Sequence, residues 1–289
     1  LLAALSWSLA SLISADLTRI LGGIGFNRIR LIFVSIMLIF YASFSNTWSS
    51  ININFLITII ISGIIGVFLG DTLLFLALQK IGPRRNNILF SLAAPFTIFL
   101  NIFVLNEKMF LIQILGCLLV FAGVIVAIVY GNNNDNNHRW EIIEGSIKLG
   151  IIFGVLAALC QAIGLILMKP ILSAGADPIA SAAIRTSISA FLLSFTYFSN
   201  NEIIIDKAKF TINIILKTIL SGFLGMALGM SLLLIALQQA DAGIIATLSS
   251  TSPIMILFLI WIITNKIPTP GAWIGTLTAI IGTTLIFVN

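Results

Sequence analysis

The chain consists of long apolar runs separated by short polar stretches. Ten of these runs are close to the roughly 20 residues that a helix needs to cross the hydrocarbon core of a membrane. In lipid, only helices and closed barrels satisfy their backbone polar groups, and these runs are too long and too uniformly apolar for barrel strands. The sequence therefore predicts an all-α integral membrane protein with ten transmembrane helices, at about 1–18, 28–45, 54–79, 85–105, 110–130, 147–169, 179–198, 212–239, 242–263 and 270–288.

One polar stretch separates five of these runs from the other five. Residues 131–140, GNNNDNNHRW, form the one low-complexity segment of the chain. We therefore expect a first five-helix unit at 1–130, a polar linker at 131–146 and a second five-helix unit at 147–289.

An internal repeat relates the two units. The segment 63–79, GIIGVFLGDTLLFLALQ, aligns without a gap with 222–238, GFLGMALGMSLLLIALQ, and nine of the seventeen positions are identical. Arg30 and Arg185 lie near the start of the second helix of each unit. Because each unit has an odd number of helices, the second enters the membrane from the opposite side. This predicts two inverted five-helix repeats, an arrangement found in many secondary transporters.

Composition excludes an ordinary soluble domain. Of the 289 residues, 59% are hydrophobic and only 9% are charged, against about 25% charged in soluble domains. The net charge of +5 then concerns membrane topology, and we expect no nucleic-acid partner, no metal and no cofactor. No G-x4-G-K-[ST] motif is present, so ATP drive by this chain is unsupported. Cys117 and Cys160 lie in apolar runs, where we expect packing rather than a disulfide.

Several motifs resemble one transporter family. They are the GD-x3-F-x-AL motif at 70–78 and the Glu107-Lys108 pair that ends the fourth helix, followed by Gly116. Together with the repeated five helices, they resemble the EamA-domain proteins of the drug/metabolite transporter superfamily over essentially the whole chain. The resemblance implies ten helices in two inverted bundles and the transport of small metabolites such as amino acids, nucleobases, sugars or drugs.

Asp71 is the sharpest functional candidate. It lies well inside the third helix, where a charged Asp costs roughly 2.5 to 3.5 kcal/mol and therefore faces a cavity or a partner. One interpretation is a proton relay, and the other is a structural hydrogen bond to a Ser or Thr on another helix. Phe75, one turn further on the same face, either presents its ring to a substrate or simply packs. The second repeat has Met230 at the equivalent position, so acidic chemistry is confined to the first.

Repeated glycines and prolines predict how the helices meet and break. The glycines have a spacing that lets helices approach closely, either as a rocking contact between bundles or as static packing; they are Gly63, Gly66, Gly70, Gly222, Gly225 and Gly229. Pro95 and Pro253 are expected to interrupt the fourth helix of each repeat and to kink it. Ser91 precedes the first proline, and Ser250 and Thr251 precede the second. These hydroxyls either line a substrate site or bond to the preceding turn of their own helix.

The remaining candidates are polar side chains in otherwise apolar helices. Trp7, Ser11 and Gln161 are candidate substrate contacts, although Trp7 is also a candidate interface anchor. Gln161 should face inward, because an unbonded amide is costly in lipid. For Arg30 and Arg185 we expect snorkelling to the lipid headgroups, with anion binding or gating as the alternative.

The distribution of Lys and Arg predicts an orientation. Connections on one side carry twelve such residues and those on the other side carry three. The positive-inside rule therefore favours a cytoplasmic location for the twelve, with both termini outside. The family resemblance favours cytoplasmic termini, so both orientations are open.

The sequence as a whole favours a secondary transporter working by alternating access. We expect a multi-pass protein of the plasma (inner) membrane of a bacterium that moves a neutral or zwitterionic metabolite, with protons as a candidate coupling ion. Two other classes are a non-transporting membrane scaffold and a membrane-embedded enzyme acting on lipid-linked substrate. The enzyme is disfavoured because such sites need clusters of His, Cys or carboxylates, and His138 in the linker is the only histidine.

Overall fold

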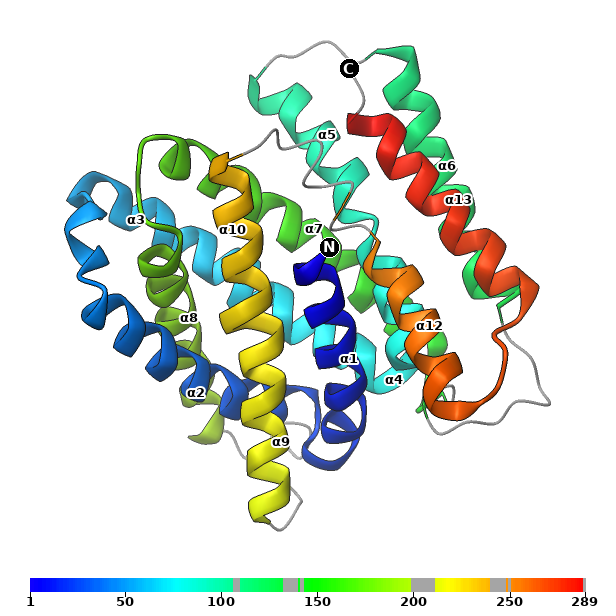
Figure 1. The fold of residues 1–289 in the computed structure, drawn as a ribbon, viewed down its shortest axis with the longest axis horizontal. Coiled ribbons are helices and arrows are strands. Elements are labelled where there is room, and N and C mark those ends of the chain that lie inside the picture. The colour runs from blue at the N-terminus through cyan, green and yellow to red at the C-terminus, as the bar shows by residue number, and fades with distance from the viewer. Residues whose placement is uncertain are drawn as a thin grey trace.

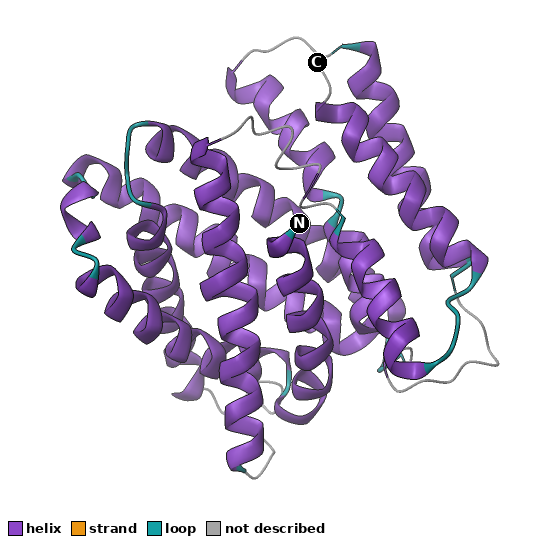
Figure 2. Cartoon of the chain, in the orientation of Figure 1, coloured by secondary structure: helices purple, strands orange, loops and turns teal. Residues whose placement is uncertain are grey.

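The computed structural model describes residues 1–105, 110–131, 140, 143–198, 211–239, 248 and 251–287. All regular structure in these ranges is helical (Figure 2). In the first half, the helices are α1 (Leu2–Leu21), α2 (Gly23–Phe44), η1 (Thr47–Ser50), α3 (Ile53–Ser62), η2 (Gly63–Leu69), α4 (Gly70–Phe90), α5 (Ala93–Leu105) and α6 (Leu111–Val129). In the second half, they are α7 (Ile147–Ser173), α8 (Pro178–Ser194), η4 (Phe195–Phe198), α9 (Ile212–Gly222), η5 (Phe223–Leu228), α10 (Gly229–Gln239), α12 (Ser252–Thr264) and α13 (Pro270–Phe287).

These helices coincide with the ten expected spans, although part of the ninth, at 242–263, lies outside the described residues. Six helical segments in the described ranges are long and apolar enough to cross a membrane, namely Gly23–Phe44, Ile53–Phe90, Leu111–Val129, Ile147–Ser173, Pro178–Tyr197 and Ile212–Ala236. Large apolar side chains also cover the outer surface: Phe44 is 85% exposed and Ile53 is 76% exposed. Such a surface is stable in lipid and not in water.

The third and fourth spans are separated within α4. Gly82 has φ 77° and ψ 169°, a conformation that glycine adopts readily, and Pro83 begins the helix that follows. The expected spans 54–79 and 85–105 left Gly82 and Pro83 between two helices, and the structure breaks the helix at this position.

The expected span 85–105 is interrupted, as the sequence predicted, but the break comes before Pro95 rather than as a kink at the proline itself. Pro95 lies in the first turn of α5, because the chain already breaks at Ser91 and Leu92. Pro253 likewise lies in the first turn of α12. The physical reason is that the first turn of a helix has no internal acceptor for its N–H groups, so proline loses nothing there.

The repeated glycine motif adopts an unusual backbone in both halves. η2 and η5 are π-helical, with one more residue per hydrogen-bonded turn than an α-helix, and each continues directly into an α-helix on both sides. Such segments are rare and occur frequently at functional sites. The expected helices at 54–79 and 212–239 are therefore present, but each contains a widened turn that periodicity does not reveal.

Helices from the two halves pack against each other throughout the molecule. α6 and α13 lie side by side and antiparallel (Figure 1), with Gly116 facing Gly282 and Gly123 facing Gly275. A Cβ placed on Gly123 would lie 2.5 Å from the carbonyl oxygen of Gly275, so only glycine permits this approach. α2 and α8 are also antiparallel neighbours, since Arg28 at the start of α2 bonds to Thr196, just after α8 ends.

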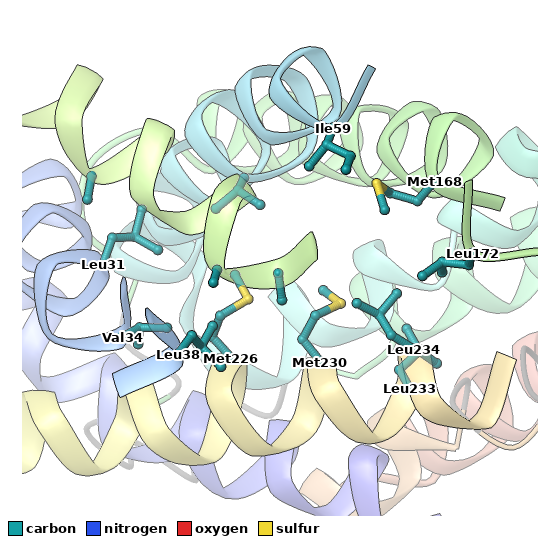
Figure 3. Close-up of a cluster of buried hydrophobic side chains, with 14 of the residues drawn as sticks. Leu31, Val34, Leu38, Ile59, Met168, Leu172, Met226, Met230, Leu233 and Leu234 are labelled. Carbon is teal, nitrogen blue, oxygen red and sulfur yellow. The ribbon is translucent and has the colours of Figure 1, made fainter. Parts of the chain in front are cut away.

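The largest buried apolar cluster draws on both halves. Figure 3 shows side chains of η5 and α10 facing residues of α2, α3 and α7. The labelled residues are Leu31, Val34, Leu38, Ile59, Met168, Leu172, Met226, Met230, Leu233 and Leu234. This core fixes the positions of α8 and α10, which flank the polar residues described next.

Candidate functional site

Asp71 forms an ion pair inside the helix bundle. Its Oδ2 lies 2.9 Å from Nη1 of Arg30 in α2, and their side chains are 13% and 6% exposed. The partner of Asp71 is therefore an arginine, whereas the sequence-based alternative expected a structural hydrogen bond to a Ser or Thr. The guanidinium replaces part of the hydration that the buried carboxylate has lost.

Arg30 is held by several groups besides Asp71. Its Nη1 also donates to Oδ1 of Asn27 at 3.2 Å, and its guanidinium carbon lies 4.8 Å from the ring centre of Phe75, a cation–π contact. Phe75 in turn packs edge to face on Phe26, with ring centres 4.9 Å apart. Phe75 is thus a buried packing partner of the ion pair. The prediction that Arg30 snorkels to the headgroups is wrong, because the side chain turns inward to a carboxylate.

Arg185 in α8 is the counterpart of Arg30 in the second half, and its environment is different. Only 1% of the residue is exposed, and no described residue accepts a hydrogen bond from its Nε or Nη2. Asp71 interacts with it electrostatically. Snorkelling is therefore wrong for this residue too. Both arginines lie within helices rather than in the connections between them. When they are left out of the count of Lys and Arg in the connections, one side still carries a large excess of these residues.

Glycines of η2 make room for the Arg185 side chain. A Cβ on Gly66 would lie 2.9 Å from Nη2 of Arg185, and one on Gly164 in α7 would lie 3.3 Å from the same atom. Gly63 packs on the backbone of Arg185, and the hydroxyl of Ser189 donates to the carbonyl oxygen of Gly63 at 3.0 Å. Thus η2, in the first half, is fitted against α7 and α8 of the second.

η5 makes the reciprocal contacts with α1 and α2. Nε1 of Trp7 donates to the carbonyl oxygen of Gly225 at 2.8 Å, and a Cβ on Gly229 would lie 2.6 Å from the same nitrogen. A Cβ on Gly222 would contact Arg30 at 3.2 Å. Trp7 therefore lies at the contact between the halves, and its indole N–H is already bonded.

A second polar group joins α1, α4 and α12. Asn87 donates through Nδ2 to Oγ of Ser11 at 2.8 Å and accepts from Oγ of Ser252 at 3.3 Å. Ser252 also lies 3.1 Å from Ser8, oxygen to oxygen. Sequence reasoning selected Ser11, and it counted Ser252 among the hydroxyl residues before Pro253, but it missed Asn87 and Ser8. The signal for Asn87 was an amide side chain inside the expected apolar span 85–105.

The other candidates have more local contacts. Ser91 and Thr251 donate to carbonyl oxygens three residues back, Ile88 at 2.6 Å and Leu248 at 2.7 Å. Both hydroxyls thus bond to the preceding turn of their own chain, which was the alternative to lining a substrate site. Gln161 is buried, at 6% exposure, as expected of an inward-facing amide. Ser250 lies outside the described residues, as do Glu107, Lys108 and His138.

The helices and their contacts define a polytopic membrane protein whose two halves interlock through a glycine-rich segment from each. The model of the EamA-like transporter family matches residues 1–129 and 148–288. The chain therefore belongs to the EamA-like transporter family, which is part of the drug/metabolite transporter superfamily.

Comparison with solved structures supports the same fold. One crystal structure matches with a TM-score of 0.71 over 98% of this chain and 93% of the other, although only 15% of the residues are identical. At that identity the likeness concerns the fold alone. No curated protein sequence matches the chain.

Proposed function

We propose that the chain is a secondary transporter that moves a small metabolite by alternating access between two inverted repeats. Membership of a transporter family supports the class. The antiparallel packing of α2 on α8 and of α6 on α13, each pair joining the two halves, supports the inverted relation.

The observation that carries this proposal is the reciprocal fit of the two π-helical segments. η2 packs on α7 and α8, and η5 packs on α1 and α2. Both contacts run through glycines, whose lack of side chains lets one helix slide or tilt on another with little steric resistance. A pair of equivalent, glycine-lined contacts gives the molecule two places at which to open, one for each side of the membrane.

The substrate site lies, in this proposal, between these two contacts. The ion pair of Arg30 with Asp71, the Trp7 indole and the Arg185 guanidinium all adjoin η2, η5 or the helices against which they pack. Charged groups inside a membrane protein are expensive and mark pathways for ions or substrates. Asp71 is our candidate for coupling to protons, since it is the acidic side chain of this group.

Exchange in proteoliposomes tests the proposal. Purified protein is reconstituted in vesicles loaded with a labelled mixture of amino acids, nucleobases and organic acids, and efflux is measured on adding each unlabelled compound outside. We expect one compound class to accelerate efflux without nucleotide, and a substrate-driven pH change that Asp71→Asn removes. Wild-type vesicles that exchange nothing faster than empty ones, despite correctly folded protein, favour the scaffold.

A further inference from the structure

Arg185 is a buried charge, and two of its three guanidinium nitrogens have no hydrogen-bond partner among the described residues. Its Nε and Nη2 are both buried without an acceptor. Ser181, one helical turn earlier on the same face of α8, is 0% exposed and its hydroxyl likewise has no partner among the described residues. Buried polar groups are bonded in the great majority of proteins, so two such groups on one helix face point to a ligand.

The internal repeat explains why Arg185 lacks a partner. Arg30 pairs with Asp71, whereas Met230 of α10 occupies the position equivalent to Asp71 in the second half. Met230 belongs to the same buried cluster as Ala182 and Ala183, which lie three and two residues before Arg185 on α8. The apolar thioether offers no charge. The second half therefore has an arginine equivalent to Arg30 but no carboxylate equivalent to that of Asp71.

The charges around the site leave one positive charge uncompensated. By formal charge, Arg30 and Arg185 contribute two positive charges, and Asp71, which pairs with Arg30 and interacts with Arg185, contributes one negative charge. Arg185 is seven residues from the start of α8, about 10 Å along the helix, and only 1% of the residue is exposed. A single uncompensated charge at this depth matches a monoanion that belongs to the transported molecule.

From these observations we infer that Arg185, with the Ser181 hydroxyl, binds the carboxylate of the transported metabolite. The fork of guanidinium N–H groups suits the two oxygens of a carboxylate, and the hydroxyl provides a further donor. The inference rests on the proposed function and revises the expectation of a neutral substrate, which assumed no basic residue inside the bundle. A zwitterion, which also carries a carboxylate, remains compatible.

Ligand-dependent unfolding of the purified chain in detergent tests the inference without requiring transport. The probes are benzoate and benzamide, which share a ring and differ in charge, and inorganic phosphate. We expect benzoate to raise the midpoint of thermal unfolding and benzamide not to. In Arg185→Gln, the affinity for benzoate should fall about tenfold to a hundredfold, because charge-assisted hydrogen bonds are lost. Lys217→Gln, which removes a charge from the exposed face of α9, should bind as the wild type does.

Met230→Asp provides a second variant that keeps Arg185 in place. It supplies the carboxylate that the repeat lacks, so benzoate binding should disappear while the protein stays folded. Undiminished benzoate binding in either Arg185→Gln or Met230→Asp overturns the inference, as does equal binding of benzamide. Binding of phosphate but not benzoate overturns the carboxylate assignment. Because the assay measures binding alone, a negative result leaves the transport proposal standing, and failed exchange with intact benzoate binding counts only against transport.

Discussion

The arrangement of Arg30, Asp71 and Arg185 predicts that neutralising different members of the group lowers the free energy of unfolding by different amounts. At 2.9 Å and an effective dielectric constant of about 20, the attraction between Arg30 and Asp71 is about 6 kcal/mol before the cost of desolvation. Leaving one partner of a buried pair uncompensated typically costs about 3–5 kcal/mol. Asp71→Asn should reach the upper part of this range, because it leaves both Arg30 and Arg185 without a carboxylate.

Arg30→Gln should be less damaging than Asp71→Asn. In that variant Asp71 keeps the favourable interaction with Arg185, so its charge is still partly compensated. The double variant Arg30→Gln with Asp71→Asn removes both charges and leaves two neutral groups able to hydrogen-bond. We therefore expect it to be more stable than Asp71→Asn alone, and the two effects to be far from additive.

Unfolding by increasing SDS in mixed micelles measures these differences. Tryptophan fluorescence reports the transition, and the free energies of unfolding of the wild type, the two single variants and the double variant complete a thermodynamic cycle. Lys217→Gln controls for the loss of one positive charge on the surface. Equal losses for Asp71→Asn and Arg30→Gln, or a double variant whose loss equals their sum, would refute the shared-carboxylate reasoning.

Three further predictions concern packing. Gly123→Ala places a Cβ 2.5 Å from the backbone of Gly275, and we expect about 1–3 kcal/mol of destabilisation from the separation of α6 and α13, measured by thermal unfolding. Trp7→Phe removes the 2.8 Å hydrogen bond to Gly225 and should cost about 1 kcal/mol in the same SDS assay; an unchanged stability would mean that the bond contributes nothing. Gly82→Ala puts a side chain at φ 77° against the backbone of Trp140, so we expect a lower unfolding midpoint and reduced yield of folded protein in membranes.

The spans were predictable because membrane insertion imposes a strong and local constraint. About 20 apolar residues are needed per crossing, so hydropathy alone locates most of the helices. The turn at Gly82 was readable for the same reason, since glycine, proline and two arginines rarely continue an apolar helix. The glycine repeat also predicted close approach, and a Cβ placed on Gly66 would lie 2.9 Å from Nη2 of Arg185 and one on Gly225 would lie 3.2 Å from Cβ of Ala10.

The partners of the charged residues were not predictable from the sequence. Arg30 and Asp71 are 41 positions apart, and Arg185 contacts η2 from the other half, so only the folded arrangement brings them together. Reading the arginines as helix starts also placed them at the headgroups, whereas each lies about 10 Å into its helix. The rule that arginine snorkels applies near a membrane surface and fails where an acidic group or a ligand is available inside.

The two halves share their packing and differ in their charge. Equivalent glycines, Gly66 and Gly225, receive an arginine from the opposite half, so the contacts on the two sides are similar in kind. Alternating access needs two states of comparable free energy, and similar contacts on the two sides favour such a balance. The carboxylate present at Asp71 and absent at Met230 breaks the symmetry only at the polar centre. Within the repeated segments 63–79 and 222–238, Asp71 against Met230 is the one charge difference. If the proposed function holds, this difference creates the binding site, so Met230→Asp should impair substrate recognition more than folding.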